Sequence, residues 1–216
     1  MAFIGCTWAI PATVLLILLG GSSRADDKIG DALLSSEFQS KVAYCKTCHG
    51  LSGQGYRGYY PMPRLAGQQT DYLESQLRDF AEGRRLSPLM FNVARVLNPS
   101  MRSELAAHFR DLNPKPIGGA PRELMTIGKE IYEEGISDAG IAPCSSCHGS
   151  DAKGDGAFPR LAGQLYEYIV KRFESWRKER QASLVSPDTS VIMESIAQNL
   201  SESQIAAVAA YLSNLE

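Results

Sequence analysis

The sequence CKTCHG at residues 45–50 recurs as CSSCHG at residues 144–149, so one chain of 216 residues holds the pattern Cys-X-X-Cys-His-Gly twice. A second motif follows each copy, because PRLAGQ occurs unchanged at residues 63–68 and 159–164. The two copies are 99 residues apart for the first motif and 96 for the second, which indicates loops of different length. The chain is therefore an internal duplication, and each half has its own set of motifs.

The apolar pattern predicts helices at corresponding places in both halves. After each PRLAGQ motif, apolar residues recur at the spacing of an amphipathic helix. The closing helix of the first half begins at Asn98 and Pro99, a capping side chain followed by a proline at the first helical position. The closing helix of the second half begins at Ser201, which forms a capping box with Gln204. Since no run of alternating β-branched residues predicts a strand, the expected fold class is all-α.

The boundary between the halves is marked by composition. The segment NPKPIGGAP at residues 113–121 holds three prolines and two glycines, which leave little capacity for helix or strand. We therefore expect one domain at residues 26–112 and a second at residues 122–216, joined by this linker.

The N-terminal segment has the pattern of an export signal. It is uncharged from Ala2 to Ser23, contains an apolar run and ends in small residues around Ala25. This predicts a signal peptide over residues 1–25. The alternative is an uncleaved membrane anchor, because the uncharged stretch is as long as the ~20 residues that span a bilayer. In both cases we expect the remainder of the protein outside the cytoplasm.

The net charge argues against nucleic acid as a partner, and the positions of the cysteines define the candidate site. The chain carries 22 basic and 24 acidic side chains, and loss of residues 1–25 would remove only Arg24 among them. This slightly acidic balance argues against a nucleic-acid partner. The same cleavage would remove Cys6, so the four remaining cysteines all belong to the two CXXCHG motifs.

The spacing Cys-X-X-Cys-His is typical of covalent haem attachment. The two thiols lie about one helical turn apart, so they reach the vinyl groups on one edge of a porphyrin, and the next residue offers its imidazole to the iron. We predict two haem c groups, with thioether bonds at Cys45, Cys48, Cys144 and Cys147 and proximal iron ligands at His49 and His148. The haems would also enlarge the buried apolar core of two domains that are small.

Two other uses of this cysteine pattern remain open. A structural zinc site collects four Cys or His ligands, and neither half contains the second pair that it needs. A thioredoxin-like redox pair lies at a strand-to-helix junction, and no strand is predicted. Both interpretations have less support than haem.

Methionine as a second iron ligand would favour Fe(II) and raise the reduction potential. Of the methionines after residue 25, only Met90 and Met193 match each other in the repeat, 41 and 45 residues after the motif histidines. We therefore predict Met90 and Met193 as distal ligands, which leaves neither iron open to a substrate. The alternative is that both methionines simply fill the core.

These motifs, with a tyrosine-headed helix after PRLAGQ, then a methionine and a closing helix, resemble those of the cytochrome c4 family. The resemblance covers nearly all of the chain after the N-terminal segment. It implies two tandem class I cytochrome c domains, each wrapped around one covalently attached haem. It also implies that the carbonyls of Pro63 and Pro159 accept the imidazole N–H bonds. Arg64 and Arg160 would approach the haem propionates.

The expected function is single-electron transfer in the periplasm, without catalysis by the chain itself. Expected partners are redox proteins: a membrane cytochrome complex, a terminal oxidase or a dehydrogenase. One alternative is the dihaem subunit of an enzyme complex such as flavocytochrome c sulfide dehydrogenase. Another is a dihaem peroxidase or thiosulfate dehydrogenase, which would need an open or differently ligated iron.

Overall fold

The computed structural model describes Met1, residues 23–179 and residues 190–216. By its internal contacts the chain divides into two compact units, Met1–Glu37 and Phe38–Glu216. Helix α1 (Ser23–His49) begins in the first unit and ends in the second, which contains both CXXCHG motifs. The predicted signal peptide lies almost wholly outside the described residues. No helix within the described ranges is long and apolar enough to cross a membrane.

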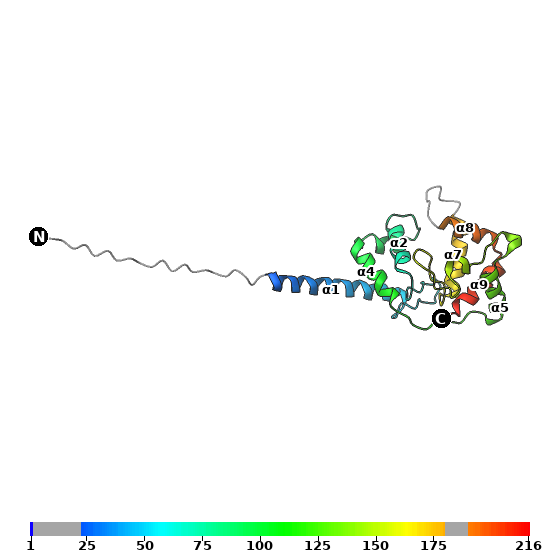
Figure 1. The fold of residues 1–216 in the computed structure, drawn as a ribbon, viewed down its shortest axis with the longest axis horizontal. Coiled ribbons are helices and arrows are strands. Elements are labelled where there is room, and N and C mark those ends of the chain that lie inside the picture. The colour runs from blue at the N-terminus through cyan, green and yellow to red at the C-terminus, as the bar shows by residue number, and fades with distance from the viewer. Residues whose placement is uncertain (2–22, 180–189) are drawn as a thin grey trace. The chain divides into compact units, whose positions relative to one another are not determined.

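The described residues form helices, turns and a few isolated β-bridges, so the all-α prediction is confirmed. After α1, the first half contains α2 (Thr70–Ala81), α3 (Pro88–Ala94) and α4 (Pro99–Arg110). The second half contains η1 (Arg122–Leu124), α5 (Met125–Glu134), η2 (Ser137–Ala139), α6 (Ser145–His148), α7 (Tyr166–Glu179), α8 (Ser190–Asn199) and α9 (Glu202–Ser213). Within the second unit these helices form two groups that follow the chain order (Figure 1). Residues 113–121, between the groups, have no helix or strand.

Both predicted starts of the closing helices are confirmed. Asn98 Oδ1 accepts a hydrogen bond from Met101 N at 2.8 Å, and Pro99 is the first residue of α4. At α9, Ser201 Oγ accepts from Gln204 N at 3.2 Å and Gln204 Oε1 accepts from Ser201 N at 2.7 Å. These bonds satisfy N–H groups that the first helical turn leaves without an intrahelical partner. Each closing helix therefore begins at a position that its own side chains determine.

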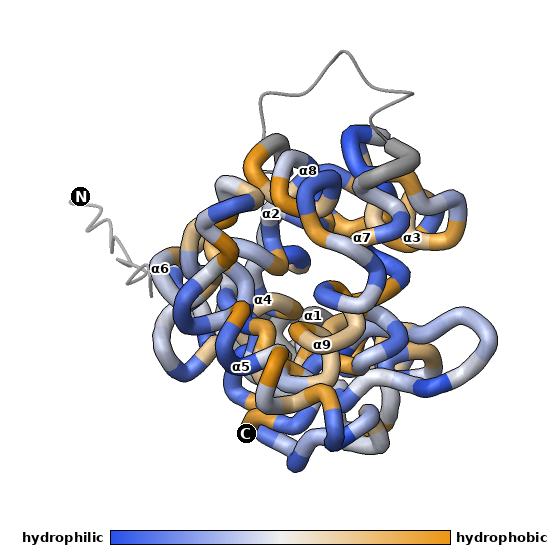
Figure 2. The backbone as a smooth tube through the Cα atoms, turned by 90° about the vertical axis from the view of Figure 1, so that its right-hand side faces the viewer, coloured by the Kyte–Doolittle hydropathy of each residue, from blue (hydrophilic) through white to orange (hydrophobic). Residues whose placement is uncertain are grey.

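Each half has a core of its own, built largely on its closing helix. In the first half, Leu105 and Phe109 of α4 pack with Leu73 of α2. In the second half α9 is buried along most of its length, and Figure 2 shows its tube as mainly hydrophobic. Gly128 of α5 lies so close to α9 that a Cβ atom there would stand 2.0 Å from the carbonyl oxygen of Ala207. A glycine thus permits the tight crossing of α5 and α9.

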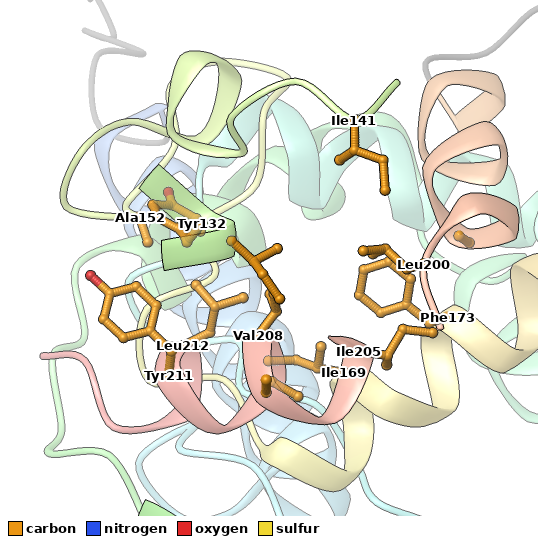
Figure 3. Close-up of a cluster of buried hydrophobic side chains, with 14 of the residues drawn as sticks. Tyr132, Ile141, Ala152, Ile169, Phe173, Leu200, Ile205, Val208, Tyr211 and Leu212 are labelled. Carbon is orange, nitrogen blue, oxygen red and sulfur yellow. The ribbon is translucent and has the colours of Figure 1, made fainter. Parts of the chain in front are cut away.

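The core of the second half surrounds an open space. Figure 3 shows Phe173 of α7, Leu200, and Val208 and Leu212 of α9 around this space, on different sides of it. All four side chains are buried, and all four line a large cavity. The helices of this half are therefore arranged around a cavity, with the histidine motif at its edge.

Candidate haem-binding sites

The two CXXCHG motifs end their helices in the same way. His49 is the last residue of α1, and His148 is the last residue of α6. The glycines that follow, Gly50 and Gly149, have φ angles of +86° and +79°. Residues with a Cβ atom rarely adopt such angles. The terminal glycine of the motif therefore lets the chain leave the helix directly after the histidine.

Both imidazoles are buried and held by a backbone carbonyl. His49 Nδ1 lies 2.8 Å from Pro63 O, and His148 Nδ1 lies 3.0 Å from Pro159 O. With Nδ1 as the donor, the lone pair of Nε2 is available to a metal. Burial lowers the pKa of both imidazoles, which favours the neutral form that metals bind.

The four motif cysteines are free thiols that line the same cavity. Burial raises the pKa of Cys144 to about 11, and it also raises the pKa of Cys45. Redox-active cysteine pairs have lowered thiol pKa values, so this environment argues against a thioredoxin-like site. In the described part of the chain, no group of three or more His, Cys, Asp or Glu side chains is arranged to hold a metal ion.

One continuous cavity of about 910 Å³ joins the two motifs. Its lining is mostly apolar and contains His49 and His148 as well as residues of α2, α7 and α9. Three methionines line it as well: Met62, Met90 of α3 and Met193 of α8. The structure thus places both predicted distal ligands at the cavity that holds the histidines. Met62 is a third sulfur that the repeat pattern does not select, because Phe158 is at the corresponding position.

The polar part of the lining fits an anionic group. Among the described residues, six basic side chains line the cavity against two acidic ones. Arg64 is 3% exposed, and neither Nη1 nor Nη2 has a hydrogen-bond partner. Trp176 Nε1 is likewise buried without a partner. Burial and then the charge of Arg160 lower the pKa of Arg64 to about 10, so a nearby carboxylate would stabilise its charged form. Haem, an apolar ring that carries carboxylates, fits both parts of this lining.

Comparison with known proteins identifies the family. The family model for cytochrome c matches residues 125–216. The chain is 33% identical to cytochrome c-552 of Acidithiobacillus ferridurans over 94% of this chain and 85% of that protein. It is 34% identical to cytochrome c4 of Thiocapsa roseopersicina over 90% of this chain and 98% of that protein. The chain belongs to the cytochrome c4 family.

Solved structures agree with this assignment to the cytochrome c4 family. Reduced recombinant cytochrome c4 from Pseudomonas stutzeri superposes with a TM-score of 0.73 at 28% identity, over 84% of this chain and 98% of that one. Cytochrome c4 of Acidithiobacillus ferrooxidans gives a TM-score of 0.69 at 35% identity, over 79% of this chain and 98% of that one. The chain therefore has the class I cytochrome c fold and is a dihaem electron-transfer cytochrome with two haem c groups.

Another relative has a name that states its electron donor. The thiosulfate dehydrogenase electron acceptor of Thiomonas intermedia (strain K12) is 34% identical over 80% of this chain and 78% of that protein. The name of this relative describes a protein that accepts electrons from a dehydrogenase.

In this cytochrome c4 family member, the two PRLAGQ motifs bind each other across the halves. Gln164 Oε1 accepts from Arg64 N at 2.8 Å, and Gln164 Nε2 donates to Arg64 O at 3.1 Å. Reciprocally, Gln68 Oε1 accepts from Arg160 N at 2.6 Å, and Gln68 Nε2 donates to Arg160 O at 2.9 Å. All four residues are buried. The two identical motifs thus make the same contact twice across one interface.

The charged residues of α7 make other contacts than the sequence predicts. The sequence predicts an ordinary solvated face in which Glu167 pairs with Lys171. In the structure, Glu167 Oε1 accepts from Arg57 Nε of the first half at 2.9 Å. Lys171 Nζ lies 4.1 Å from the ring centroid of Tyr60, and Arg172 lines the cavity. This face of α7 therefore contacts the first half.

We expect Gln164→Leu to lower the free energy of unfolding of the haem-loaded protein by about 2–4 kcal/mol, because the buried N–H and C=O of Arg64 lose their partners. Denaturant titration followed by haem absorbance measures this loss. The control is Gln39→Leu, an exposed residue of α1, which should change the free energy of unfolding by less than ~0.5 kcal/mol. Equal stability of the two variants would refute a role for the paired glutamines.

Proposed function

We propose that this family member is a periplasmic electron carrier in which each half holds one haem by the same groups. Cys45, Cys48, Cys144 and Cys147 form the thioether bonds, His49 and His148 are the proximal ligands, and Met90 and Met193 are the distal ligands. The observation that carries this proposal is that these groups, from both halves, line one continuous cavity.

The chain determines which side chains ligate each iron, how each haem is buried and how the imidazoles are oriented. When bound, each haem supplies one-electron iron chemistry. The carbonyls of Pro63 and Pro159 hold the imidazoles in one orientation, and Arg64 and Arg160 would pair with the propionates. Methionine on the far side of the iron would leave no coordination position for a substrate, which favours electron transfer over catalysis by the chain itself.

The shared cavity also supports exchange of electrons between the two sites within one chain. Residues of both histidine motifs line this one cavity. The reciprocal glutamine contacts hold the two halves together at this place. We further propose that the halves are domains at residues 26–112 and 122–216 with a linker at 113–121, and that residues 1–25 direct export.

The partners of this chain are redox proteins. The similarity to a thiosulfate dehydrogenase electron acceptor favours a dehydrogenase as the electron donor. A second candidate function is therefore the electron-accepting subunit of a dehydrogenase. Both candidates use the same two sites and differ only in whether the chain stays with its donor.

Purification of the full chain from a host that attaches haem after export tests these proposals. We expect two haems per chain, and oxidation of the reduced protein by membranes that contain a terminal oxidase. Copurification with a dehydrogenase, and reduction by thiosulfate only when that dehydrogenase is added, would favour the subunit. Fewer than two haems per chain, or thiosulfate oxidation by the chain alone, would contradict the proposed carrier.

A further inference from the structure

Trp176 of α7 carries a buried hydrogen-bond donor for which the described residues supply no acceptor. Its indole Nε1 is shielded from solvent and makes no hydrogen bond. The side chain lines the cavity and packs against the core of the second half, as Cys144 and Met193 also do. Because a buried N–H without an acceptor destabilises a fold, most such groups have a partner. A suitable acceptor would therefore belong to the group that fills the cavity.

Two neighbours on the same helix hold the indole ring. Phe173 meets it edge to face, with 5.6 Å between the ring centroids and an interplanar angle of 77°. The guanidinium carbon of Arg172 lies 4.3 Å from the ring centroid on the Trp176 side chain. These residues precede Trp176 by three and four positions, which is the spacing of neighbours on one helix face. Figure 3 shows Phe173 at the open space of this half, so α7 itself fixes the ring beside the cavity.

The first half has no donor at the corresponding position. At the offset of 96 residues, Trp176 of α7 matches Phe80 of α2. Phe80 is buried and lines the same cavity. A phenyl ring cannot donate a hydrogen bond, whereas an indole donates one through Nε1. At this position, therefore, only the site of the second half has a polar hydrogen.

The acceptors that the chain itself offers at the cavity do not serve Trp176. Two described carboxylates line the cavity, Asp79 and Glu194. Asp79 belongs to the first half and accepts from Arg84 Nε at 2.9 Å. Glu194 of α8 is partly buried and does not bind Trp176 Nε1. The sulfur of Met193 is a weak acceptor. A haem carries carboxylates of its own, and hydrogen bonds to an ionised carboxylate are stronger than those between neutral groups.

We propose that Trp176 Nε1 donates a hydrogen bond to a propionate carboxylate of the haem in the second half. This inference rests on the proposed function, since it requires a haem there. The negative charge of a propionate opposes the addition of an electron to the iron. A hydrogen bond that stabilises this charge weakens the opposition, so Trp176 raises the reduction potential of the second haem. The first haem lacks this contribution, because Phe80 is in the corresponding place.

The variant Trp176→Phe tests the proposal, because it gives the second half the residue of the first. In the purified dihaem protein we expect one midpoint potential to fall and the other to stay unchanged. The propionate bending modes of one haem should shift in the resonance Raman spectrum, while both haems and the full sulfur-to-iron absorption band remain. The matched control is Phe80→Leu, which removes ring volume at the corresponding position without removing a donor. It should leave the propionate modes of both haems in place.

A measurement on the unmodified protein does not depend on how well a variant folds. Loss of residues 1–25 would remove Trp8, the other tryptophan of the sequence, and would leave Trp176 as the source of a single indole N–H signal in the NMR spectrum of the reduced protein. We expect this proton to exchange slowly with heavy water. The variant Glu194→Gln should leave the signal where it is, because Glu194 is not the acceptor.

The outcomes separate this inference from the proposed function. If Trp176→Phe lowers the melting temperature but changes neither potential and no propionate mode, Trp176 only fills the core and the proposal is wrong. A fast-exchanging indole proton would overturn it as well, and so would an indole signal that moves in Glu194→Gln. Loss of the sulfur-to-iron band in Trp176→Phe would identify Met193 as the acceptor and would contradict the propionate assignment. Fewer than two haems in the unmodified protein would instead refute the proposed function.

Discussion

The double variant Cys144→Ser and Cys147→Ser is expected to bind one haem per chain, where the unmodified chain binds two. Each thiol of the motif would form one thioether bond, and serine oxygen does not replace thiolate sulfur in that reaction. Cys144 packs against the core of the second half, and Cys147 is exposed at the cavity. Haem content per chain, measured by absorbance of the alkaline pyridine complex, gives the result directly.

The same variant should also unfold its own half. Phe173, Leu200 and Val208 are buried around the cavity and do not fill it. Residual cavities destabilise a fold by about 24 cal/mol per Å³. The cavity of about 910 Å³ serves both halves, so loss of one haem would leave about half of it empty, which on that scale costs as much as the whole net stability of a typical domain, about 5–15 kcal/mol. We therefore expect loss of helical signal together with loss of haem.

Two controls make the cysteine result specific. Ser145→Ala changes a spacer residue of the same motif and should keep two haems per chain. The corresponding variant of the first half, Cys45→Ser with Cys48→Ser, should also retain one haem. Two haems in either double cysteine variant would show that the motif is not the attachment site.

Features that neighbouring residues determine were predictable from the sequence. The starts of α4 and α9 follow from Asn98 with Pro99 and from Ser201 with Gln204, because a cap is a contact within one helical turn. The amphipathic helices after each PRLAGQ motif are likewise present, as α2 and α7. In these places the sequence neighbours and the spatial neighbours are the same residues.

Contacts between the halves were not predictable in this way. Gln164 and Arg64 are 100 positions apart, and Arg85 and Tyr168 are 83 apart. No helical period relates such positions, so their pairing depends on how the two halves pack against each other. The available signal was the unbroken identity of the two PRLAGQ motifs, which a hydrogen-bonding role for Gln68 and Gln164 explains.

The predicted partner of Glu167 on the charged face of α7 was wrong for a related reason. Glu167 and Lys171 have the spacing of a helical ion pair, which an isolated helix would use. The structure pairs Glu167 with Arg57 and stacks Lys171 on Tyr60, both from the first half. A helix considered alone offers only the partners at helical spacing, whereas here the other half of the chain supplies the partners.

The proposed methionine ligands would decide between an electron carrier and an enzyme. We expect Met193→Ala to lose about half of the sulfur-to-iron absorption, to lower one midpoint potential, and to bind carbon monoxide in the ferrous state. Sulfur favours Fe(II), and its removal opens a coordination position. Met90→Ala should give the same three changes at the other site, because Met90 and Met193 line one cavity at matching positions.

Met62→Leu is the control for these variants, because Met62 also lines the cavity but has Phe158 as its counterpart. It should keep the full absorption band, both potentials and the resistance to carbon monoxide. If Met62→Leu loses the band while Met90→Ala keeps it, the distal ligand of the first half is Met62, and the symmetrical assignment is wrong. If the unmodified ferrous protein already binds carbon monoxide, one iron is open, and the chain itself becomes a candidate enzyme. A closed iron in both halves, opened only by loss of Met90 or Met193, is the result that electron transfer without catalysis requires.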